Sequence, residues 1–240
     1  MLPRILHPGL APGPNELSEE DSHHLIRVLR ARQGDALVLF NGQGLEAQAV
    51  LTEAHPQACL CLADDPQQVL RESPTKTTVL QALCTGDKMD WVVQKACELG
   101  ASRLLPVRTQ RAQLKLDGDR AHKRQQHWQR IADSAAAQCG RNRVLLVEPV
   151  MGLEEALADF KAHSSTGWLL DPFAQASLST APLAADLTIA IGPEAGWSDQ
   201  EEAQMLAAGF NGLRCGPRIL RTETAAVVVL SAIAVRLGEF

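Results

Sequence analysis

Short apolar runs alternate with helical patterns along residues 75–240, and this alternation constrains the fold more than any other feature of the chain. Runs typical of buried strands lie at Thr78–Cys84, Arg103–Val107, Val144–Val147, Gly167–Leu170, Leu187–Ile191 and Gly212–Cys215. The helical patterns between them are Lys88–Leu99, Arg120–Cys139, Leu153–His163, Asp199–Ala208 and Thr222–Leu237. Ser198 and Glu201 have the spacing of a capping box, which fixes the start of the fourth helix. Such alternation predicts an α/β domain in which helices cover a parallel sheet.

The first seventy residues have a different pattern, that of a small β-barrel-like module. Strand-like runs lie at Asp35–Phe40, Leu45–Leu51 and Ala58–Ala63, and Asn41-Gly42 between the first two is a strong hairpin signal. One helix is expected over Ser18–Ala31, with Ser18 as its N-cap. The polar segment Pro66–Pro74 is bracketed by prolines, so we place a boundary there and expect domains over residues 1–70 and 75–240.

Charge is divided unevenly along the chain, whose net charge is -5. Residues 71–146 hold 14 basic against 7 acidic residues, between acidic flanks. A local basic stripe on an acidic protein could hold a phosphate backbone, although a solvated helix face would give the same pattern.

Composition excludes several classes of protein. A hydrophobic content of 45% with 21% charged residues is ordinary for a globular chain. No apolar run approaches the roughly 20 residues that span a bilayer, and the N-terminus lacks the apolar segment of a secretory signal. Six cysteines are too few for a disulfide scaffold, and the close pair Cys59 and Cys61 lacks a second pair to complete a zinc site. We therefore expect a cytoplasmic protein with reduced thiols, no membrane association and no metal.

Two loops of the same design follow the last two predicted strands. Gly192-Pro193 comes directly after one strand and Gly216-Pro217 after the other, and each loop leads into a helix. Ligands of open α/β sheets bind beyond the carboxyl ends of the strands, and glycine lets the backbone approach a ligand closely. We expect the two loops at adjacent sheet ends, as the two sides of a cofactor slot. A Gly-Pro pair can also simply end a strand, but the sequence has no P-loop or G-x-G-x-x-G motif in this domain to suggest another ligand.

The segments IGPEAGWSDQEE (Ile191–Glu202) and CGPRILRTETAA (Cys215–Ala226) resemble the signature loops of the RsmE family. His24–Arg30, Gly86–Gly100, Leu114–Asp117 and Gln138–Arg143 are also similar to that family, so the resemblance covers nearly the whole chain. These are SPOUT-class methyltransferases that methylate N3 of a uridine in bacterial 16S ribosomal RNA with S-adenosylmethionine. Two positions depart from the family pattern. Ala195 replaces a glycine, so the loop must have negative φ there, and Cys215 replaces a leucine.

The resemblance implies a PUA-like N-terminal barrel for RNA and a C-terminal α/β domain with a trefoil knot. It also implies a homodimer with the site beside the subunit interface, acting on 16S rRNA within an assembled or nearly assembled small ribosomal subunit. The last helix is apolar over Ala225–Val235, which suits such an interface but equally suits a buried core helix.

The expected site residues fall into three groups. Those expected to contact S-adenosylmethionine are Leu170, Asp171, Ile191, Gly192, Pro193, Glu194, Gly196, Cys215, Gly216, Ile219, Leu220 and Thr222. Those expected to contact RNA are Arg4, His7, Arg27, Arg30, Arg141 and Arg143. The catalytic candidates are Arg221 and Glu194.

Chemistry at uracil N3 assigns roles to the two catalytic candidates. N3 becomes nucleophilic only as its proton leaves and negative charge spreads to the flanking carbonyls. The guanidinium of Arg221 could stabilise that charge, or it could instead form a salt bridge to Glu223 or Glu194. Glu194 could serve as the general base, or it could bind the loop backbone. Two alternative functions stay open: a SPOUT methyltransferase acting on another RNA nucleoside, and a non-catalytic ribosome-associated RNA-binding protein.

Overall fold

The chain forms two compact units in the computed structural model, which describes residues 2–163 and 165–240. The first unit comprises the residues up to Glu72 together with Ala136–Val144, and the second comprises Ser73–Ala135 and Leu145–Phe240. The segment Ala136–Val144 therefore belongs with the N-terminal unit, although it lies in the middle of the range 75–240.

The first unit contains a six-stranded sheet in the order β1-β3-β4-β5-β2, with β6 paired to β4. Its strands are β1 (Arg4–Leu6), β2 (Gly13–Glu16), β3 (Ala36–Phe40), β4 (Leu45–Glu53), β5 (Leu60–Ala63) and β6 (Gln67–Gln68). The hairpin predicted at Asn41-Gly42 joins β3 to β4, and the Asn41 side chain accepts hydrogen bonds from the backbone N–H groups of Gln43 and Leu45. β1 and β2 were not predicted, because they are short and β2 carries Gly and Pro in place of an apolar pattern.

The predicted helix Ser18–Ala31 is only partly α-helical. Helix α1 (Glu19–His23) begins after Ser18, whose side chain accepts a hydrogen bond from the N–H of Asp21 at 3.1 Å. The chain then continues as a π-helical segment, His24–Val28, and Arg30 has a φ of 58°. The prediction of a continuous α-helix was therefore wrong beyond His23. The π-helical turn still buries Leu25 in the core of the unit.

The second unit is built on a seven-stranded, entirely parallel sheet, which confirms the predicted α/β architecture. The strands are β7 (Lys76–Ala82), β8 (Arg103–Arg108), β9 (Leu146–Val147), β10 (Met151–Gly152), β11 (Thr166–Leu170), β12 (Asp186–Ile191) and β13 (Phe210–Leu213). The order is β10-β8-β7-β12-β11-β13, with β9 paired to β8. The expectation that the two loops follow adjacent strands was therefore wrong, because β11 lies between β12 and β13. The two Gly-Pro loops consequently stand on either side of the end of β11.

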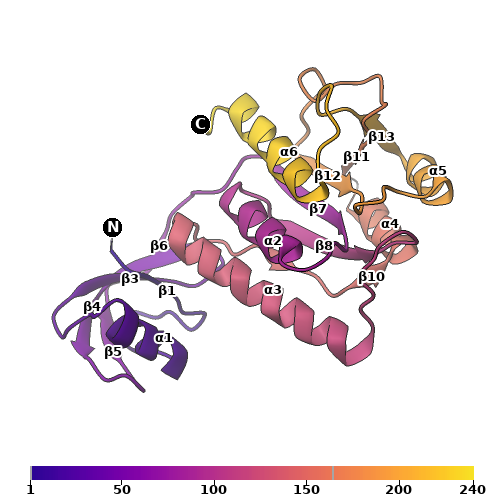
Figure 1. Ribbon diagram of the computed structural model, residues 1–240. Coiled ribbons are helices and arrows are strands. Elements are labelled where there is room, and N and C mark those ends of the chain that lie inside the picture. The colour runs from indigo at the N-terminus through magenta and orange to yellow at the C-terminus, as the bar shows by residue number, and fades with distance from the viewer. Residues whose placement is uncertain (1, 164) are drawn as a thin grey trace. The chain divides into compact units, whose positions relative to one another are not determined.

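The helices begin and end close to the predicted positions. They are α2 (Lys88–Glu98), α3 (Gly118–Cys139), α4 (Leu153–Ala162), α5 (Asp199–Ala208) and α6 (Thr222–Leu237). The capping box predicted at the start of α5 is present, with the Ser198 side chain on the N–H of Glu201 and the Glu201 carboxylate on the N–H of Ser198. Helices α2 and α6 pack side by side, and α4 packs against α5 (Figure 1).

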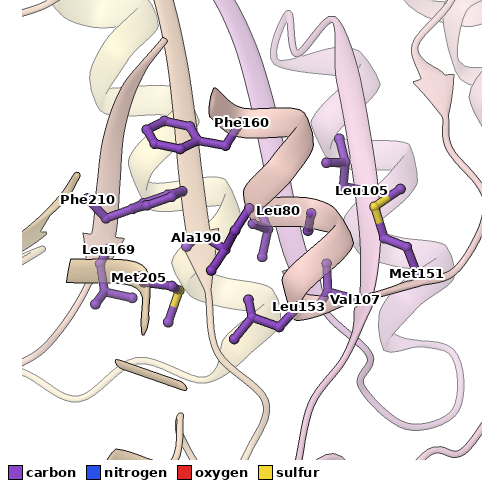
Figure 2. Close-up of a cluster of buried hydrophobic side chains, with 12 residues drawn as sticks. Leu80, Leu105, Val107, Met151, Leu153, Phe160, Leu169, Ala190, Met205 and Phe210 are labelled. Carbon is purple, nitrogen blue, oxygen red and sulfur yellow. The ribbon is translucent and has the colours of Figure 1, made fainter. Parts of the chain in front are cut away.

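Buried side chains from the sheet, from α4 and from α5 form one hydrophobic cluster in this unit (Figure 2). The rings of Phe160 and Phe210 pack within it, with their centroids 4.2 Å apart. A Cβ atom on Gly167 would lie 2.8 Å from Phe210 and 2.9 Å from Phe160. Glycine at position 167 therefore allows both rings to pack directly on β11.

Candidate active site

A cavity of about 670 Å³ opens at the carboxyl ends of β12, β11 and β13, where ligands of α/β sheets bind. The structure brings all the residues expected to contact the cofactor into the lining of this single cavity. They are Leu170, Asp171, Ile191, Gly192, Pro193, Glu194, Gly196, Cys215, Gly216, Ile219, Leu220 and Thr222. Leu170 and Asp171 lie at the end of β11, between the two Gly-Pro loops.

The loop after β12 is a tight turn. The N–H of Gly196 donates to the carbonyl of Pro193 at 2.9 Å, and Gly196 has a φ of +72°, which favours glycine. Ala195 has negative φ as expected, since Arg30 is the one non-glycine residue with positive φ in the described part of the chain. The alanine at position 195 is therefore compatible with the turn.

The loop after β13 depends on a glycine for its conformation. Gly216 has a φ of +122°, and a Cβ atom placed on it would have no neighbour within 4 Å. The same loop carries Ile219, whose side chain is 79% exposed although it lines the cavity. Phe173, from the loop after β11, is 80% exposed at the same cavity. Large apolar side chains left open beside a cavity suit contact with a planar ligand.

Trp197 is a cavity residue that the sequence patterns did not single out. A Cβ atom on Gly192 would lie 3.1 Å from the indole Nε1 of Trp197, so the glycine makes room for this ring. The indole N–H is buried and has no hydrogen-bond partner among the described residues. The carbonyl of Trp197 accepts a hydrogen bond from Arg111 at 2.7 Å, and Arg111 also lines the cavity. Only the position of Trp197 between the Gly-Pro pair and the capping box could have signalled its role.

Glu194 is held in its ionised form. Its Oε1 accepts hydrogen bonds from the Lys88 ammonium at 2.7 Å and from the backbone N–H and hydroxyl of Thr85 at 3.2 and 3.1 Å. Burial by itself would raise the pKa of the Glu194 carboxyl, but these donors lower the pKa to about 2. Such a weak base is unsuited to take a proton at neutral pH. The contacts of Glu194 therefore fit the alternative in which it fastens the loop, here to the start of α2.

Arg221 lines the cavity and is exposed. In the described part of the chain its guanidinium makes no ion pair, so the alternative of a salt bridge to Glu194 or Glu223 is absent. The other substitution in these loops, Cys215, is half-buried, and burial raises the pKa of its thiol to about 11. Cys215 therefore stays a neutral thiol and acts as a small apolar group in the lining.

The residues expected to contact RNA differ in their exposure. Arg4 pairs with Glu46 at 2.9 Å and donates to the Asn142 side chain, while Arg141 pairs with Glu72. Both guanidinium groups are buried within the first unit, so Arg4 and Arg141 stabilise that unit and are unsuited to direct phosphate contact. The other residues expected to contact RNA remain accessible: Arg27, Arg30 and Arg143 are exposed, and His7 is half-buried.

Within the basic segment of residues 71–146, the ten basic residues from Arg103 to Arg143 are divided in the same way. Arg103 forms ion pairs with Glu148 and Asp159. Besides Arg143, five of them are exposed and make no ion pair within the described residues, namely Lys115, Arg120, Lys123, Arg124 and Arg130. Four of these five lie on α3, which therefore presents a basic surface.

Two kinds of feature are absent from the described residues. No helix there is long and apolar enough to cross a membrane. Residues 2–163 and 165–240 also contain no group of three or more His, Cys, Asp or Glu side chains placed to hold a metal ion.

Comparison with known proteins places the chain in a family. The family model for an RNA methyltransferase domain matches residues 71–234, and that for an RNA methyltransferase PUA domain matches residues 17–63. Ribosomal RNA small subunit methyltransferase E of Bacillus subtilis is 34% identical over 229 residues, covering 91% of this chain and 88% of that protein. The crystal structure of the Neisseria gonorrhoeae protein of the same name, bound to S-adenosyl methionine, has a TM-score of 0.92 and 35% identity over 98% of both chains. A Legionella pneumophila methyltransferase in complex with the same cofactor gives the same TM-score, identity and coverage. With its two Gly-Pro loops around one cavity, the chain belongs to the ribosomal RNA small subunit methyltransferase E family, which is the RsmE family.

Proposed function

We propose that this protein transfers a methyl group from S-adenosylmethionine to N3 of a uridine in bacterial 16S ribosomal RNA. The observation that carries the proposal is the single cavity framed by both Gly-Pro loops, with the guanidinium of Arg221, which no described residue pairs, in its lining. The family relationship supports the choice of rRNA, and the cofactor bound in two similar structures supports the choice of methyl donor.

The lining of the cavity fits this cofactor. A volume of about 670 Å³ lies within the range of roughly 300–1,000 Å³ that is usual for small-molecule sites. Leu170, Ile191 and Leu220 offer apolar contact for the adenine ring, and the Asp171 carboxylate can accept hydrogen bonds from ribose hydroxyls. The buried, unpartnered indole N–H of Trp197 is a free donor in the same lining.

The reaction needs an electrophile and a nucleophile in line. S-adenosylmethionine, when bound, supplies a methyl group activated by the sulfonium. The protein must then align the uracil and stabilise the negative charge that develops on it. Arg221 stabilises this charge, because its forked donors can bind the uracil carbonyl oxygen onto which the negative charge left by the departing N3 proton spreads.

Glu194 takes no proton in this mechanism. Its carboxylate is already held by Lys88 and Thr85 and has a pKa of about 2. Because Arg221 favours the uracil anion, the N3 proton can pass to solvent water. Glu194 instead keeps the loop that carries Gly192 in place.

RNA recognition is divided between the two units. Arg27, Arg30 and Arg143 supply exposed positive charge in the first unit, and the basic surface of α3 supplies it in the second. Phosphate contacts of this kind position an RNA without reading its sequence. The assembled or nearly assembled small ribosomal subunit is the proposed substrate, and the cytoplasm is the proposed location.

The same proposal includes a homodimer and a trefoil knot formed by the chain around the cofactor loops. Apolar side chains that are partly or fully exposed run along one side of α6, at Ala225, Val228, Ala232 and Val235. This row supports a second copy of the chain as the partner of α6. Light scattering coupled to size-exclusion chromatography gives the mass that tests it.

The function is tested on small-subunit RNA that lacks N3-methyluridine. The purified protein is incubated with S-adenosylmethionine and with either free 16S rRNA or isolated small subunits, and the nucleosides are identified by mass spectrometry. N3-methyluridine is the expected product. A different methylated nucleoside would favour another SPOUT activity, and RNA binding without any product would favour a non-catalytic role.

A further inference from the structure

Gln81 is a fully buried polar residue that lies outside the lining of the cavity. It lies on β7, in the middle of the parallel sheet, and its side chain is 0% exposed. Its amide Nε2 donates to the hydroxyl of Thr222 at 2.9 Å and to the carbonyl of Ala82 at 3.0 Å. Its Oε1 is buried and has no hydrogen-bond partner among the described residues, so the two bonds of Nε2 only partly offset the free-energy cost of burying this amide.

The Thr222 hydroxyl forms a second hydrogen bond, which links Gln81 to the first Gly-Pro loop. It accepts from Gln81 and donates to the carbonyl of Gly192 at 2.7 Å. Thr222 is the first residue of α6, directly after the second Gly-Pro loop, and Gly192 belongs to the first loop. The three residues therefore form one directed series of hydrogen bonds that ties the first loop and the end of the second loop to β7. A hydroxyl can do this because it is donor and acceptor at once.

These hydrogen bonds lie next to the catalytic candidate Arg221. Thr222 directly follows Arg221, and it is 6% exposed at the first residue of α6. The Trp197 ring packs against the Cα side of Gly192. The hydrogen bond from the Thr222 hydroxyl to the Gly192 carbonyl holds the same residue from another side. A shift of the Thr222 backbone would move Arg221 and both loops together.

We propose that Gln81 is a positioning residue of the methyl-transfer reaction, acting through Thr222 to hold the two Gly-Pro loops and Arg221 in register. The inference rests on the proposed function for its catalytic part, while its part on cofactor binding stands without it. Gln81 does not line the cavity, so it can act on the site only through Thr222. Because Thr222 also bonds to Gly192, loss of the Gln81 amide should reduce cofactor affinity and methyl transfer, whereas loss of a buried hydrogen bond elsewhere in the same unit should reduce stability alone.

The experiment removes the links of the chain one at a time. Gln81→Met keeps the length of the side chain without its donor, Thr222→Val keeps the shape without the hydroxyl, and Thr222→Ser keeps the hydroxyl. Thr188→Val is the matched control, because Thr188 is buried on β12 and its hydroxyl bonds to Ser165 at 2.7 Å without lining the cavity. For each variant we measure the melting temperature, the S-adenosylmethionine affinity by calorimetry, and the single-turnover rate at saturating cofactor.

We expect Gln81→Met and Thr222→Val to weaken cofactor affinity about 3- to 10-fold, the value of one net hydrogen bond. We expect the single-turnover rate to fall about 10²-fold, the usual effect of misplacing reacting groups by about 1 Å. Thr222→Ser, which keeps the hydroxyl, should lose less affinity and less rate than Thr222→Val. The double variant Gln81→Met with Thr222→Val should be no worse than Thr222→Val alone, because both break one chain.

The proposal is overturned if Gln81→Met lowers the melting temperature as Thr188→Val does and leaves affinity and rate unchanged. Additive effects in the double variant would also overturn it. If Gln81→Met fails to fold, the contrast between Thr222→Val, Thr222→Ser and Thr188→Val decides the same question. A wild-type protein that binds the cofactor but makes no N3-methyluridine would refute the proposed function, and the affinity measurements would still test the chain of hydrogen bonds.

Discussion

Replacing Gly216 by alanine measures the backbone strain that the conformation of the loop after β13 imposes on any other residue. Its φ of +122° lies in a region that side chains rarely adopt, and a Cβ atom there would meet nothing within 4 Å. Gly216→Ala therefore adds backbone strain without a steric clash. Residues held in such regions cost about 1–3 kcal/mol each.

The strain must be visible in one of two measurements. If the loop keeps its conformation, the free energy of unfolding falls by about 1–3 kcal/mol, or about 2–4 °C in melting temperature per kcal/mol for a chain of this size. If the loop relaxes to negative φ in the free protein, stability is kept, but binding must restore the strained form and S-adenosylmethionine affinity falls about 5- to 150-fold. The two losses, expressed as free energies, should together amount to about 1–3 kcal/mol.

Gly209 provides the matched control. It has a φ of +106° after α5, it is equally open to a Cβ atom, and it lies outside the cavity lining. Gly209→Ala should therefore lower the melting temperature and leave calorimetric affinity unchanged. Wild-type stability together with wild-type affinity in Gly216→Ala would refute the reasoning, because the strained loop would then be unnecessary for binding.

Three further outcomes follow from the charged groups. Arg221→Ala should keep cofactor affinity and lower the single-turnover rate about 10²- to 10³-fold. The rate should partly recover at high pH, where uracil ionises unaided. Lost affinity with an unchanged rate would instead make Arg221 a cofactor ligand. Glu194→Gln should remove the stabilisation that Lys88 gives the ionised carboxylate. Folding lowers the pKa of Glu194 from 4.5 to about 2, so this stabilisation is fully present above pH 4.5 and is lost as the pH falls toward 2. The melting temperature of the wild type should therefore exceed that of the variant above pH 4.5, and the difference should vanish near pH 2. Replacing Lys123 and Arg124 of α3 by Gln should reduce the slope of log affinity for RNA against log salt by about 0.7 to 0.9 for each phosphate that the variant no longer neutralises, and an unchanged slope would exclude this surface.

The sequence predicted the parallel sheet and its helices well, because alternation and capping patterns are local signals. Strand order is not local, and β11 lies between β12 and β13 where the sequence suggested adjacent loop-bearing strands. The role of Arg141 could not be predicted for the same reason, since its partner Glu72 is distant in the chain. The residues that the family likeness led us to expect at the cofactor all line one cavity, and their contact with the cofactor stays a prediction. The pairing of Glu194 with Lys88 could not be predicted, because the two residues are far apart in the sequence. The trefoil knot stays a prediction.

The two sides of the cavity are held with different rigidity, and this difference suits a two-substrate reaction. The loop after β12 is fastened at three points: Glu194 to the start of α2, the Trp197 carbonyl to Arg111 in the turn after β8, and the Gly192 carbonyl to Thr222 at the start of α6. The loop after β13 is fastened at Thr222, whereas residues 216–220 make no hydrogen bond within the described part of the chain. A side held from several directions is preorganised for a small cofactor at little entropic cost. The freer stretch carries Ile219, so it can adjust to the larger and less regular RNA substrate once the cofactor is in place, while Thr222 holds the neighbouring Arg221.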